Sequence, residues 1–408
     1  MTTMAFDLDD DTLARAAWSR LTEPGDATAG ALVGALGPSR ALHWLQAAHG
    51  DADSVRRATD ALAERVPILP AGARALSTAV ARWGPRLVDL DPRRELRVLR
   101  SLGGTLVTPE LPGWPTALDD LGAATPPCLW VRGDPALAEP ASRSVALVGA
   151  RASTAYGNHV AGDLAAGLVA RDVAVVSGGA YGIDAAAHRG ALVAGGTTIV
   201  LLAGGVDRAY PAGNASLLGT VVEQGGAVVS EVPPGGAPSR WRFLQRNRLI
   251  AALSRGTVVV EAAWRSGALS TANRAGELMR PVGAVPGPIT SMASAGCHRL
   301  LREGAAVCVT DADEVVELVG QIGRDLAPGR ERDGEIADGL DAVARRVRDT
   351  LPVRGGLTPG WLAREAGLSE SEVRGALGTL ELLGMAHRNG SEWRKSVDRA
   401  PRHEHSNG

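Results

Sequence analysis

Short apolar segments separated by helix-forming stretches set the strongest limit on what this chain can fold into. Between residues 144 and 320, seven such segments alternate with Ala- and Leu-rich sequence. They are VALVG (145–149), VAVVS (173–177), TIVLLA (198–203), AVVSE (227–231), TVVVEA (257–262), VGAVPG (282–287) and AVCV (306–309). Fully apolar strands are typical of a parallel sheet with helices on both faces. The pattern predicts an α/β, doubly wound, mostly parallel sheet, whose ligands bind at the carboxyl ends of the strands.

Helical sequence flanks this Rossmann-like core, which we place at residues 91–320 with a further strand at LWVRG (129–133). Residues 1–90 predict an all-helical domain. Residues 339–395 predict helix, turn, helix and hairpin, the layout of a winged-helix domain. Its helix-start signals are Thr358 before Pro359, and Ser369 with Glu372 in a capping-box pattern. The stretch 321–338 is charged and contains glycine, so we expect a linker there, and a disordered tail at 396–408.

The segment VGALGPSRA (33–41) has two glycines three residues apart, just before a helix start. A turn of this kind, as in SAM or helix-hairpin-helix domains, can offer backbone N–H groups to a phosphate. The motif is short and degenerate, so a plain turn within a helical bundle is the favoured interpretation.

Composition excludes several classes of protein. The formal net charge of the 408 residues is −2, which rules out a uniformly basic nucleic-acid binder but not a local basic patch. Cys128, Cys297 and Cys308 form no C-x-x-C pair, so we expect neither disulfides nor a zinc site. The N-terminus lacks the pattern of a signal peptide, and no apolar run is long enough to span a bilayer. We therefore expect a cytoplasmic protein without membrane insertion.

Positive charge is carried almost wholly by arginine, because Lys395 is the only lysine in the sequence. This excludes a P-loop lysine and a Schiff-base lysine from the core. Arginine has a planar fork that grips phosphate bidentately and stacks on bases.

The segment SRWRFLQRNR (239–248) concentrates this charge beside large aromatic side chains, just before the apolar run LIAALS. We expect a helix to begin near Phe243. Arginines interleaved with aromatics supply phosphate clamps and a stacking platform, which single-stranded nucleic acid requires. The polar and aromatic residues in question are Arg240, Trp241, Arg242, Phe243, Arg246, Asn247 and Arg248.

Other strand ends repeat a related chemistry of small residues and helix N-termini. The first strand runs into VGARASTAYG, where Arg151 stands in place of the second glycine of G-x-G-x-x-G. An Arg side chain blocks the approach of a dinucleotide pyrophosphate, but suits an extended phosphate backbone. Tight turns or small donors follow two later strands at Ser177, Gly178, Ser266 and Gly267. Together, the residues at these strand ends predict an anion-binding crevice without a reactive group.

Asp184 and His188 are four residues apart and share a helix face, so a catalytic pair is conceivable. The favoured interpretation is that Asp184 caps the helix and His188 completes local hydrogen bonding, because no nucleophile with a matching motif is visible. We expect no enzyme activity, no cofactor and no metal site.

Taken in order, these motifs resemble those of the DprA/Smf family of DNA-processing proteins. The matching segments are VGAR (148–151), SGGAYGID (177–184) with AH (187–188), YP (210–211), SE (230–231), FLQRNRLI (243–250), EAAWRSGALSTA (261–272) and VPG (285–287). The match covers roughly residues 95 to 310. The resemblance implies a Rossmann-like core that binds single-stranded DNA, forms a homodimer and loads the RecA recombinase onto incoming strands during transformation. By motif, it assigns DNA contact to Arg151, Arg240 and Phe243, and arginine here replaces the lysine that the family often has.

The expected DNA-contact set therefore has eleven members: Gly149, Arg151, Ser177, Gly178, Arg240, Phe243, Arg246, Asn247, Arg248, Ser266 and Gly267. Two other functions stay open. A Rossmann-like nucleotide hydrolase would resemble the phosphoribohydrolases, whose P-G-G-x-G-T string is absent here. A winged-helix transcription regulator would sense a ligand in its core. However, the segment that would be the recognition helix, residues 369–385, has three glutamates and one arginine. This excess of negative charge is unfavourable for binding in a DNA groove.

Overall fold

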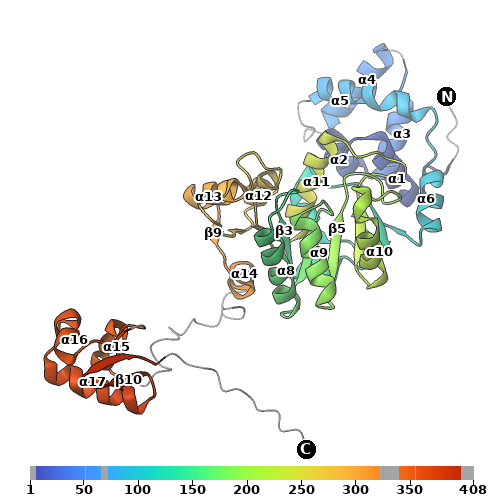
Figure 1. Cartoon of the computed structure of the whole chain (residues 1–408). Helices are drawn as coiled ribbons and strands as arrows, with labels where there is room; N and C mark the ends of the chain where they lie inside the picture. Colours follow the sequence, from blue (N-terminus) through green and yellow to red (C-terminus); the bar gives the residue numbers. More distant parts are fainter. Residues whose placement is uncertain are drawn as a thin grey trace, which may run out of the picture. The chain divides into compact units, whose positions relative to one another are not determined.

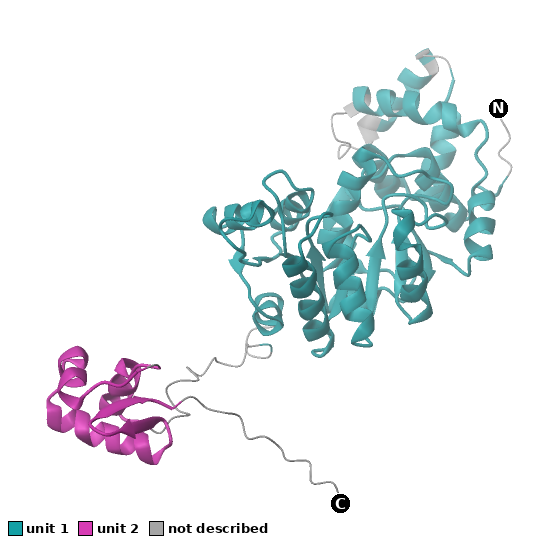
Figure 2. Ribbon diagram, viewed as in Figure 1, with its two compact units in different colours: residues 1–327 teal, residues 328–408 magenta. Residues whose placement is uncertain are grey.

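The computed structural model describes residues 6–50, 52–65, 72–320, 325, 340–353 and 355–396. The chain divides into two compact units, residues 1–327 and 328–408 (Figure 2). The predicted linker, apart from Asp325, and the predicted tail from residue 397 onward lie outside the described residues. None of the described helices has both the length and the apolar character needed to cross a lipid bilayer.

The first unit opens with a group of helices (Figure 1). They are α1 (Asp11–Leu21), α2 (Ala27–Leu36), α3 (Pro38–Ala48), α4 (Ala52–Arg65), α5 (Gly72–Trp83), the 3₁₀ helix η1 (Gly84–Leu87) and α6 (Pro92–Ser101). Asp10 and Asp26 start α1 and α2 by accepting hydrogen bonds from backbone N–H groups of the first turn. The helices bury a common apolar core, in which Trp18 and Trp83 meet edge to face with ring centroids 5.4 Å apart.

The turn between α2 and α3 uses its own backbone groups. Gly37 adopts a φ of +82° and its N–H donates to the carbonyl of Val33 at 2.8 Å, while Pro38 has no N–H to offer. The carbonyl of Pro38 accepts a hydrogen bond from the indole N–H of Trp18 at 3.1 Å. These contacts favour the plain-turn interpretation of residues 33–41 over a phosphate-binding turn.

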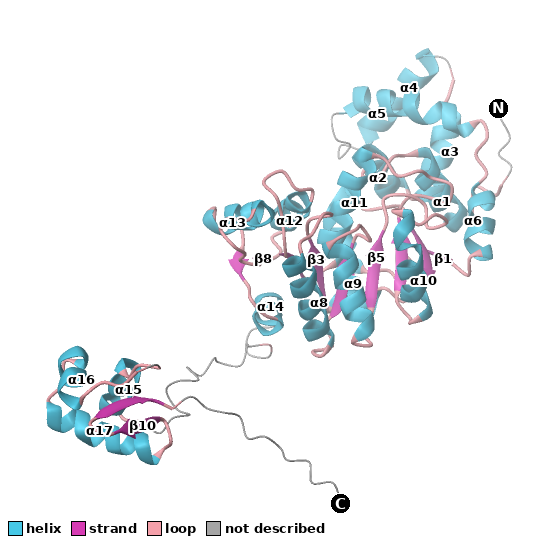
Figure 3. Cartoon of the chain, viewed as in Figure 1, coloured by secondary structure: helices cyan, strands magenta, loops and turns pink. Residues whose placement is uncertain are grey.

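Within the described part of the chain, nine strands form the central sheet. Figure 3 shows strands of this sheet in magenta. The strands are β1 (Thr105–Val107), β2 (Leu129–Gly133), β3 (Ser144–Val148), β4 (Ala174–Ser177), β5 (Thr198–Leu201), β6 (Ala227–Ser230), β7 (Gly256–Val259), β8 (Val282–Ala284) and β9 (Val307–Cys308). Their order is β1-β2-β6-β5-β4-β3-β7-β8-β9; β1 and β2 run antiparallel to their neighbours and the other pairs are parallel. The predicted mostly parallel sheet is confirmed, and β1 is a strand that the sequence analysis missed.

Helices cover both faces of the sheet. They are α7 (Ala138–Ser142), α8 (Ala155–Val169), α9 (Ile183–Val193), α10 (Ala215–Glu223), α11 (Arg240–Leu253), α12 (Ala268–Glu277), α13 (Ala295–Arg302) and α14 (Ala312–Val319), with 3₁₀ helices η2 (Thr116–Ala124), η3 (Ala212–Asn214) and η4 (Met292–Ser294). Along β3, Ala146 and Val148 pack in the same core as α11 and α12, whereas Val145 and Leu147 pack with α8 and α9. This alternation follows from the two-residue repeat of a strand.

The order of the strands reverses next to β3. From β3, the chain adds β4, β5 and β6 on one side, and later adds β7, β8 and β9 on the other. The loops that leave β3 and β7 therefore diverge, and a crevice opens between them at the carboxyl ends of the strands.

The second unit contains α15 (Ala342–Thr350), α16 (Pro359–Ala366), α17 (Glu370–Leu382) and an antiparallel hairpin of β10 (Ala386–Asn389) and β11 (Glu392–Lys395). The capping box of Ser369 and Glu372 is present at the start of α17. Thr358 precedes Pro359 at the start of α16, but its side chain makes no cap hydrogen bond. This is the element order expected for a winged helix, an assignment that stays a prediction.

Candidate functional site

A pocket of about 470 Å³ opens at the point where the strand order reverses. We call it the strand-end pocket. Its walls come from the loop after β3, the turn before α9, the first half of α11 and the start of α12. It is lined by Val148, Gly149, Arg151, Ala180, Asp184, Arg240, Phe243, Leu244, Arg246, Asn247, Ile250, Ser266, Gly267, Ala268 and Thr271. Eight of the eleven predicted contact residues are thus brought together, and Ser177, Gly178 and Arg248 are not in the lining.

Phe243 is the centre of the polar and aromatic groups in this pocket. The guanidinium carbon of Arg151 lies 4.7 Å from its ring centroid, and that of Arg246 lies 5.8 Å away. The ring of Tyr210 is 5.5 Å from it at an angle of 54°, and Tyr210 is 48% exposed. Cations placed over an aromatic face are attracted by the ring quadrupole. Tyr210 was not among the predicted contacts, although the YP motif was a signal for it.

Helix α11 begins at Arg240, three residues earlier than the predicted start near Phe243. Ser239 is its N-cap, and the Ser239 hydroxyl accepts a hydrogen bond from the N–H of Arg242 at 3.2 Å. The reason for the earlier start is this serine, a strong N-cap residue that the sequence analysis passed over. Arg240 is therefore in the first helical turn, with an exposed side chain at the edge of the pocket.

Arg246 is only 5% exposed and ties α11 to the sheet. Its guanidinium donates to the carbonyl of Gly178 at 2.6 Å and to that of Leu201. Burial lowers the pKa of Arg246 to about 10, with the Asp184 charge opposing and the Arg151 charge adding to this shift. The group is still protonated at neutral pH, so the pocket has a fixed positive charge in its wall.

Arg248 does not belong to the pocket, contrary to the prediction. It is 4% exposed and forms a buried ion pair with Glu231, which follows β6. Burial raises the pKa of Glu231, and the neighbouring Arg248 charge opposes that rise. With so little of its surface exposed and its guanidinium paired with Glu231, Arg248 is placed for a structural role and not for contact with a DNA strand.

Ser177 and Gly178 lie beneath the pocket instead of in its lining. The Ser177 hydroxyl is fully buried and donates to the carbonyl of Leu147 at 2.6 Å. A Cβ atom at position 178 would collide with the guanidinium of Arg246. Gly178 therefore leaves the space that the Arg246 guanidinium fills, whereas Ser177 is bonded to β3. Neither residue is in the pocket lining.

The loop after β3 holds Arg151 in place from both ends. A Cβ atom at Gly149 would lie 2.5 Å from Ile183 Cγ1 and 2.8 Å from the carbonyl oxygen of Glu261, so only glycine fits. At the far end, Thr154 donates from its N–H and its hydroxyl to the Glu261 carboxylate at 2.9 and 2.5 Å. Arg151 therefore projects from a loop whose ends are fixed by packing and hydrogen bonds.

The opposite wall is held by Asn247, whose side-chain amide donates to the carbonyl of Gly267 at 3.4 Å. The hydroxyl of Ser266 accepts a hydrogen bond from the N–H of Ala268 at 3.3 Å, at the start of α12. Small side chains at 266 and 267 leave room for a ligand between this turn and α11.

Asp184 and His188 each have a hydrogen-bond partner other than one another. Gly182 is the N-cap of α9, so Asp184 does not cap it as predicted; its carboxylate accepts from the N–H of Ala180 at 3.3 Å. His188 Nδ1 lies 2.7 Å from the Thr198 hydroxyl on β5. Burial raises the pKa of Asp184 and lowers that of His188 to about 3. Within the described residues, no group of three or more His, Cys, Asp or Glu side chains could hold a metal ion.

The family model of DNA recombination-mediator protein A matches residues 105–320, the whole of the sheet and its crevice. The chain belongs to this family. It is 46% identical over 399 residues to a DNA processing protein DprA of Mycobacterium tuberculosis, and the matched region covers 95% of each chain. It is 39% identical over 245 residues to protein Smf of Escherichia coli, covering 60% of this chain and 65% of that one.

The crystal structure of DNA processing protein A from Streptococcus pneumoniae has a similar fold. The TM-score is 0.55 at 30% sequence identity, and the match covers 69% of this chain and 98% of that one. The recombination-mediator family thus includes proteins that resemble this chain in sequence and in fold, and that carry a DNA-processing name.

Proposed function

We propose that this recombination-mediator family member binds single-stranded DNA in the strand-end pocket and delivers the RecA recombinase to it, without catalysing a reaction. The observation that carries the proposal is the half-buried ring of Phe243, which has Arg151 over one face and Tyr210 beside it. A base stacks on such a ring, while Arg151 and Arg240 contact the neighbouring phosphates.

The position of Phe243 favours single strands. Its ring is recessed in a pocket, and a base can reach it only after leaving its own stack and its pairing partner. The Arg151 guanidinium carbon lies 4.7 Å from the ring centroid, so a base that stacks on that face displaces the guanidinium toward the phosphates. A duplex meets both requirements only after it opens.

The lining of the pocket supports a binding role over a hydrolytic one. Among the described residues that line it, Asp184 is the one carboxylate, and it is buried against Ala180 and the charge of Arg246. A general base must reach the proton that it removes. The RecA partner is included in the proposal because the family is one of recombination mediators. The homodimer is included because the resemblance to DprA/Smf proteins implies it. We propose no cofactor.

A binding titration tests this function. The purified chain is titrated onto a fluorescent oligothymidylate and onto a duplex of equal length, at several salt concentrations. We expect preference for the single strand, and a slope of log K against log salt of about −0.7 for each neutralised phosphate. Equal or tighter binding to the duplex, or an affinity that salt does not change, contradicts the proposal.

The RecA step needs its own assay. RecA is added to oligonucleotide coated with single-strand-binding protein, and its filament formation is followed with and without this chain. We expect faster filament formation with the wild-type chain and none of this gain with the Phe243→Ala variant. A gain that survives the loss of strand binding separates the two activities and contradicts this part of the proposal.

A further inference from the structure

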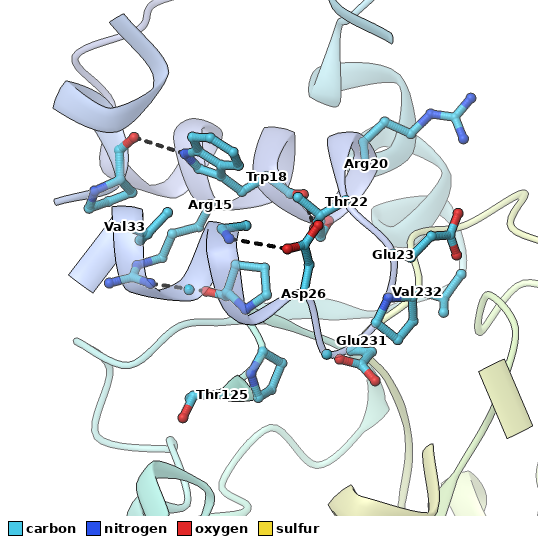
Figure 4. A pocket seen from close by; sticks show the side chains of 18 of the residues that line it. Arg15, Trp18, Arg20, Thr22, Glu23, Asp26, Val33, Thr125, Glu231 and Val232 are labelled. Carbon is cyan, nitrogen blue, oxygen red and sulfur yellow. Dashed lines mark hydrogen bonds between the residues drawn. The ribbon is translucent and has the colours of Figure 1, made fainter. Parts of the chain in front are cut away.

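The N-terminal helices meet the core along a seam that contains a pocket of about 400 Å³ (Figure 4). One side of the seam is formed by α1, α2 and the turn between them, residues 22–26. Figure 4 shows Glu23 of this turn and Glu231 and Val232 of the core around the same pocket. The Asp26 carboxylate is instead directed to the N-terminal helices, where it accepts from Ala29 N–H and Trp83 Nε1–H. Among the residues that the structure describes, two ion pairs cross the seam: Arg15 pairs with Glu110, and Arg242 pairs with Glu23.

Helix α11 takes part in both this seam and the strand-end pocket, through different faces. Phe243 and Asn247, four residues apart, line the pocket. Arg242, Gln245 and Arg248, three residues apart, form a second row along the helix. The backbone at Gly25 is packed against this second row, because a Cβ atom there would lie 2.5 Å from Gln245 Oε1 and 3.2 Å from Arg248 Nε.

The Glu23 carboxylate holds Arg242 in a two-pronged contact. Arg242 Nε donates to Oε2 at 2.9 Å and Nη2 donates to Oε1 at 3.1 Å, while Nη1 donates to the carbonyl of Ala237 at 2.8 Å. Arg86 also donates to Glu23 at 3.1 Å. Partial burial raises the pKa of Glu23, but the guanidinium groups of Arg242 and Arg86 outweigh it and lower the pKa below its ordinary value. The pair is therefore ionised at neutral pH, and Arg242 is already occupied.

The two halves of α11 depend on different supports. From Arg246 to Leu253 the helix is buried in the core, which fixes it. From Arg240 to Gln245 its residues are exposed or half-buried, and first turns of helices fray when little holds them. The Ser239 cap and the packing of the Phe243 ring against Tyr210 support this turn from the core. The described ion pair that reaches it from the N-terminal helices is that of Arg242 with Glu23. The Arg240 and Phe243 side chains start from the same turn.

We propose that Glu23 is a positioning residue for strand binding. By holding Arg242, it fixes the first turn of α11 and with it the places of Arg240 and Phe243 at the pocket. The N-terminal helices would then contribute to DNA affinity without touching DNA. This inference rests on the proposed single-strand binding at the strand-end pocket.

The test compares two variants that each remove one ion pair across the seam. Glu23→Ala frees the first turn of α11, whereas Glu110→Ala breaks the pair with Arg15, which is on α1 and far from α11 in the chain. Affinity for a fluorescent oligothymidylate is measured for both. We expect Glu23→Ala to weaken binding roughly three- to tenfold, the range typical of indirect coupling, and Glu110→Ala to stay within about twofold of wild type.

The direction of the affinity change in Glu23→Ala shows whether Glu23 acts by positioning Arg242 or only through its negative charge. Removal of a carboxylate near a DNA site strengthens binding if only its charge matters, because DNA is an anion. A rise in affinity for Glu23→Ala, no change, or an equal loss in Glu110→Ala overturns the inference. Where Glu23→Ala melts well below wild type, Glu23→Gln, which keeps the length and one acceptor, is measured in its place and must still bind more weakly.

A double-variant cycle shows whether Glu23 acts through Arg242. We expect Glu23→Ala to change affinity less than about 1.5-fold in an Arg242→Ala background, because the group that it holds is absent. An undiminished effect there overturns the route through Arg242. A wild-type chain that does not bind the oligonucleotide refutes the proposed function and this inference together. A wild-type chain that binds no better than Glu23→Ala refutes the inference alone.

Discussion

The four arginines of residues 240–248 differ in burial and in hydrogen-bond partners, although they look equivalent in the sequence. Arg240 stays exposed at the strand-end pocket, and Arg242 is paired with Glu23. Arg246 is bonded to carbonyls at the ends of β4 and β5. Arg248 is buried with Glu231. A charge run is therefore no measure of a charged surface, because each side chain is positioned by partners distant in the chain.

This difference predicts opposite results for Arg240→Ala and Arg248→Ala. Loss of Arg248 leaves the Glu231 carboxylate buried without its partner, which typically costs about 3–5 kcal/mol of folding stability. Loss of Arg240 removes an exposed phosphate contact, so stability is kept and the slope of log K against log salt becomes shallower by about 0.7. Thermal melting and strand titration measure the two effects. Equal melting of both variants contradicts the burial argument.

Phe243 and Arg151 should contribute to binding by different physics. Phe243→Ala removes a stacking surface and should cost roughly 1–3 kcal/mol of binding with little change in the salt slope. Arg151→Ala should weaken binding to all sequences alike and reduce the slope by less than about one unit. The competing interpretation is that Phe243 is a core residue, whose truncation costs about 3–5 kcal/mol of folding stability. A Phe243→Ala chain that melts early but binds normally while folded would establish that alternative.

At the scale of elements, buried side-chain hydrogen bonds join helices to strands of the sheet. His188 joins α9 to β5 through Thr198, whose hydroxyl donates to the carbonyl of Val175 at 2.9 Å. The Thr198 oxygen therefore accepts from Nδ1–H, and among the described groups Nε2 has no partner. Protonation would place a charge in a buried position with no acceptor. Burial, the Arg246 charge and the Arg189 charge accordingly lower the pKa of His188 to about 3.

The buried contact between His188 and Thr198 predicts that the free energy of unfolding depends on pH. The unfolded chain binds a proton at His188 near the ordinary pKa of 6.5, whereas the folded chain does so only near 3. The contribution of His188 to the free energy of unfolding is constant above pH 6.5. It falls as the pH drops toward 3, by at most about 1.4 kcal/mol per pH unit. Denaturant unfolding between pH 5 and 7 should show a flatter profile in His188→Gln. The exposed His159 on α8 supplies the control, and a similar flattening in His159→Gln would contradict this assignment.

At the scale of the whole molecule, the residues proposed to bind DNA all belong to the first compact unit. We therefore expect a chain that ends after Ala327 to bind single strands within about twofold of the full chain. The second unit has an acidic helix α17, which carries Glu370, Glu372 and Glu381, and such a helix is repelled by phosphates. A large loss of affinity in the shortened chain would show that residues 328–408 take part. Strand titration of the two chains measures this directly.

The sequence by itself determined where the strands of the core lie and which loops carry the site. Fully apolar segments between helical stretches left a covered parallel sheet as the fitting arrangement, and the motifs mark its carboxyl ends. The sequence did not reveal β1, because three residues, Thr105–Val107, are too short for a pattern and depend on pairing with β2. Nor did it separate Arg240 from Arg248, or show that Glu23 holds Arg242. Burial and pairing are decided by partners such as Glu231, which meets Arg248 only when β6 and α11 come together in the folded chain.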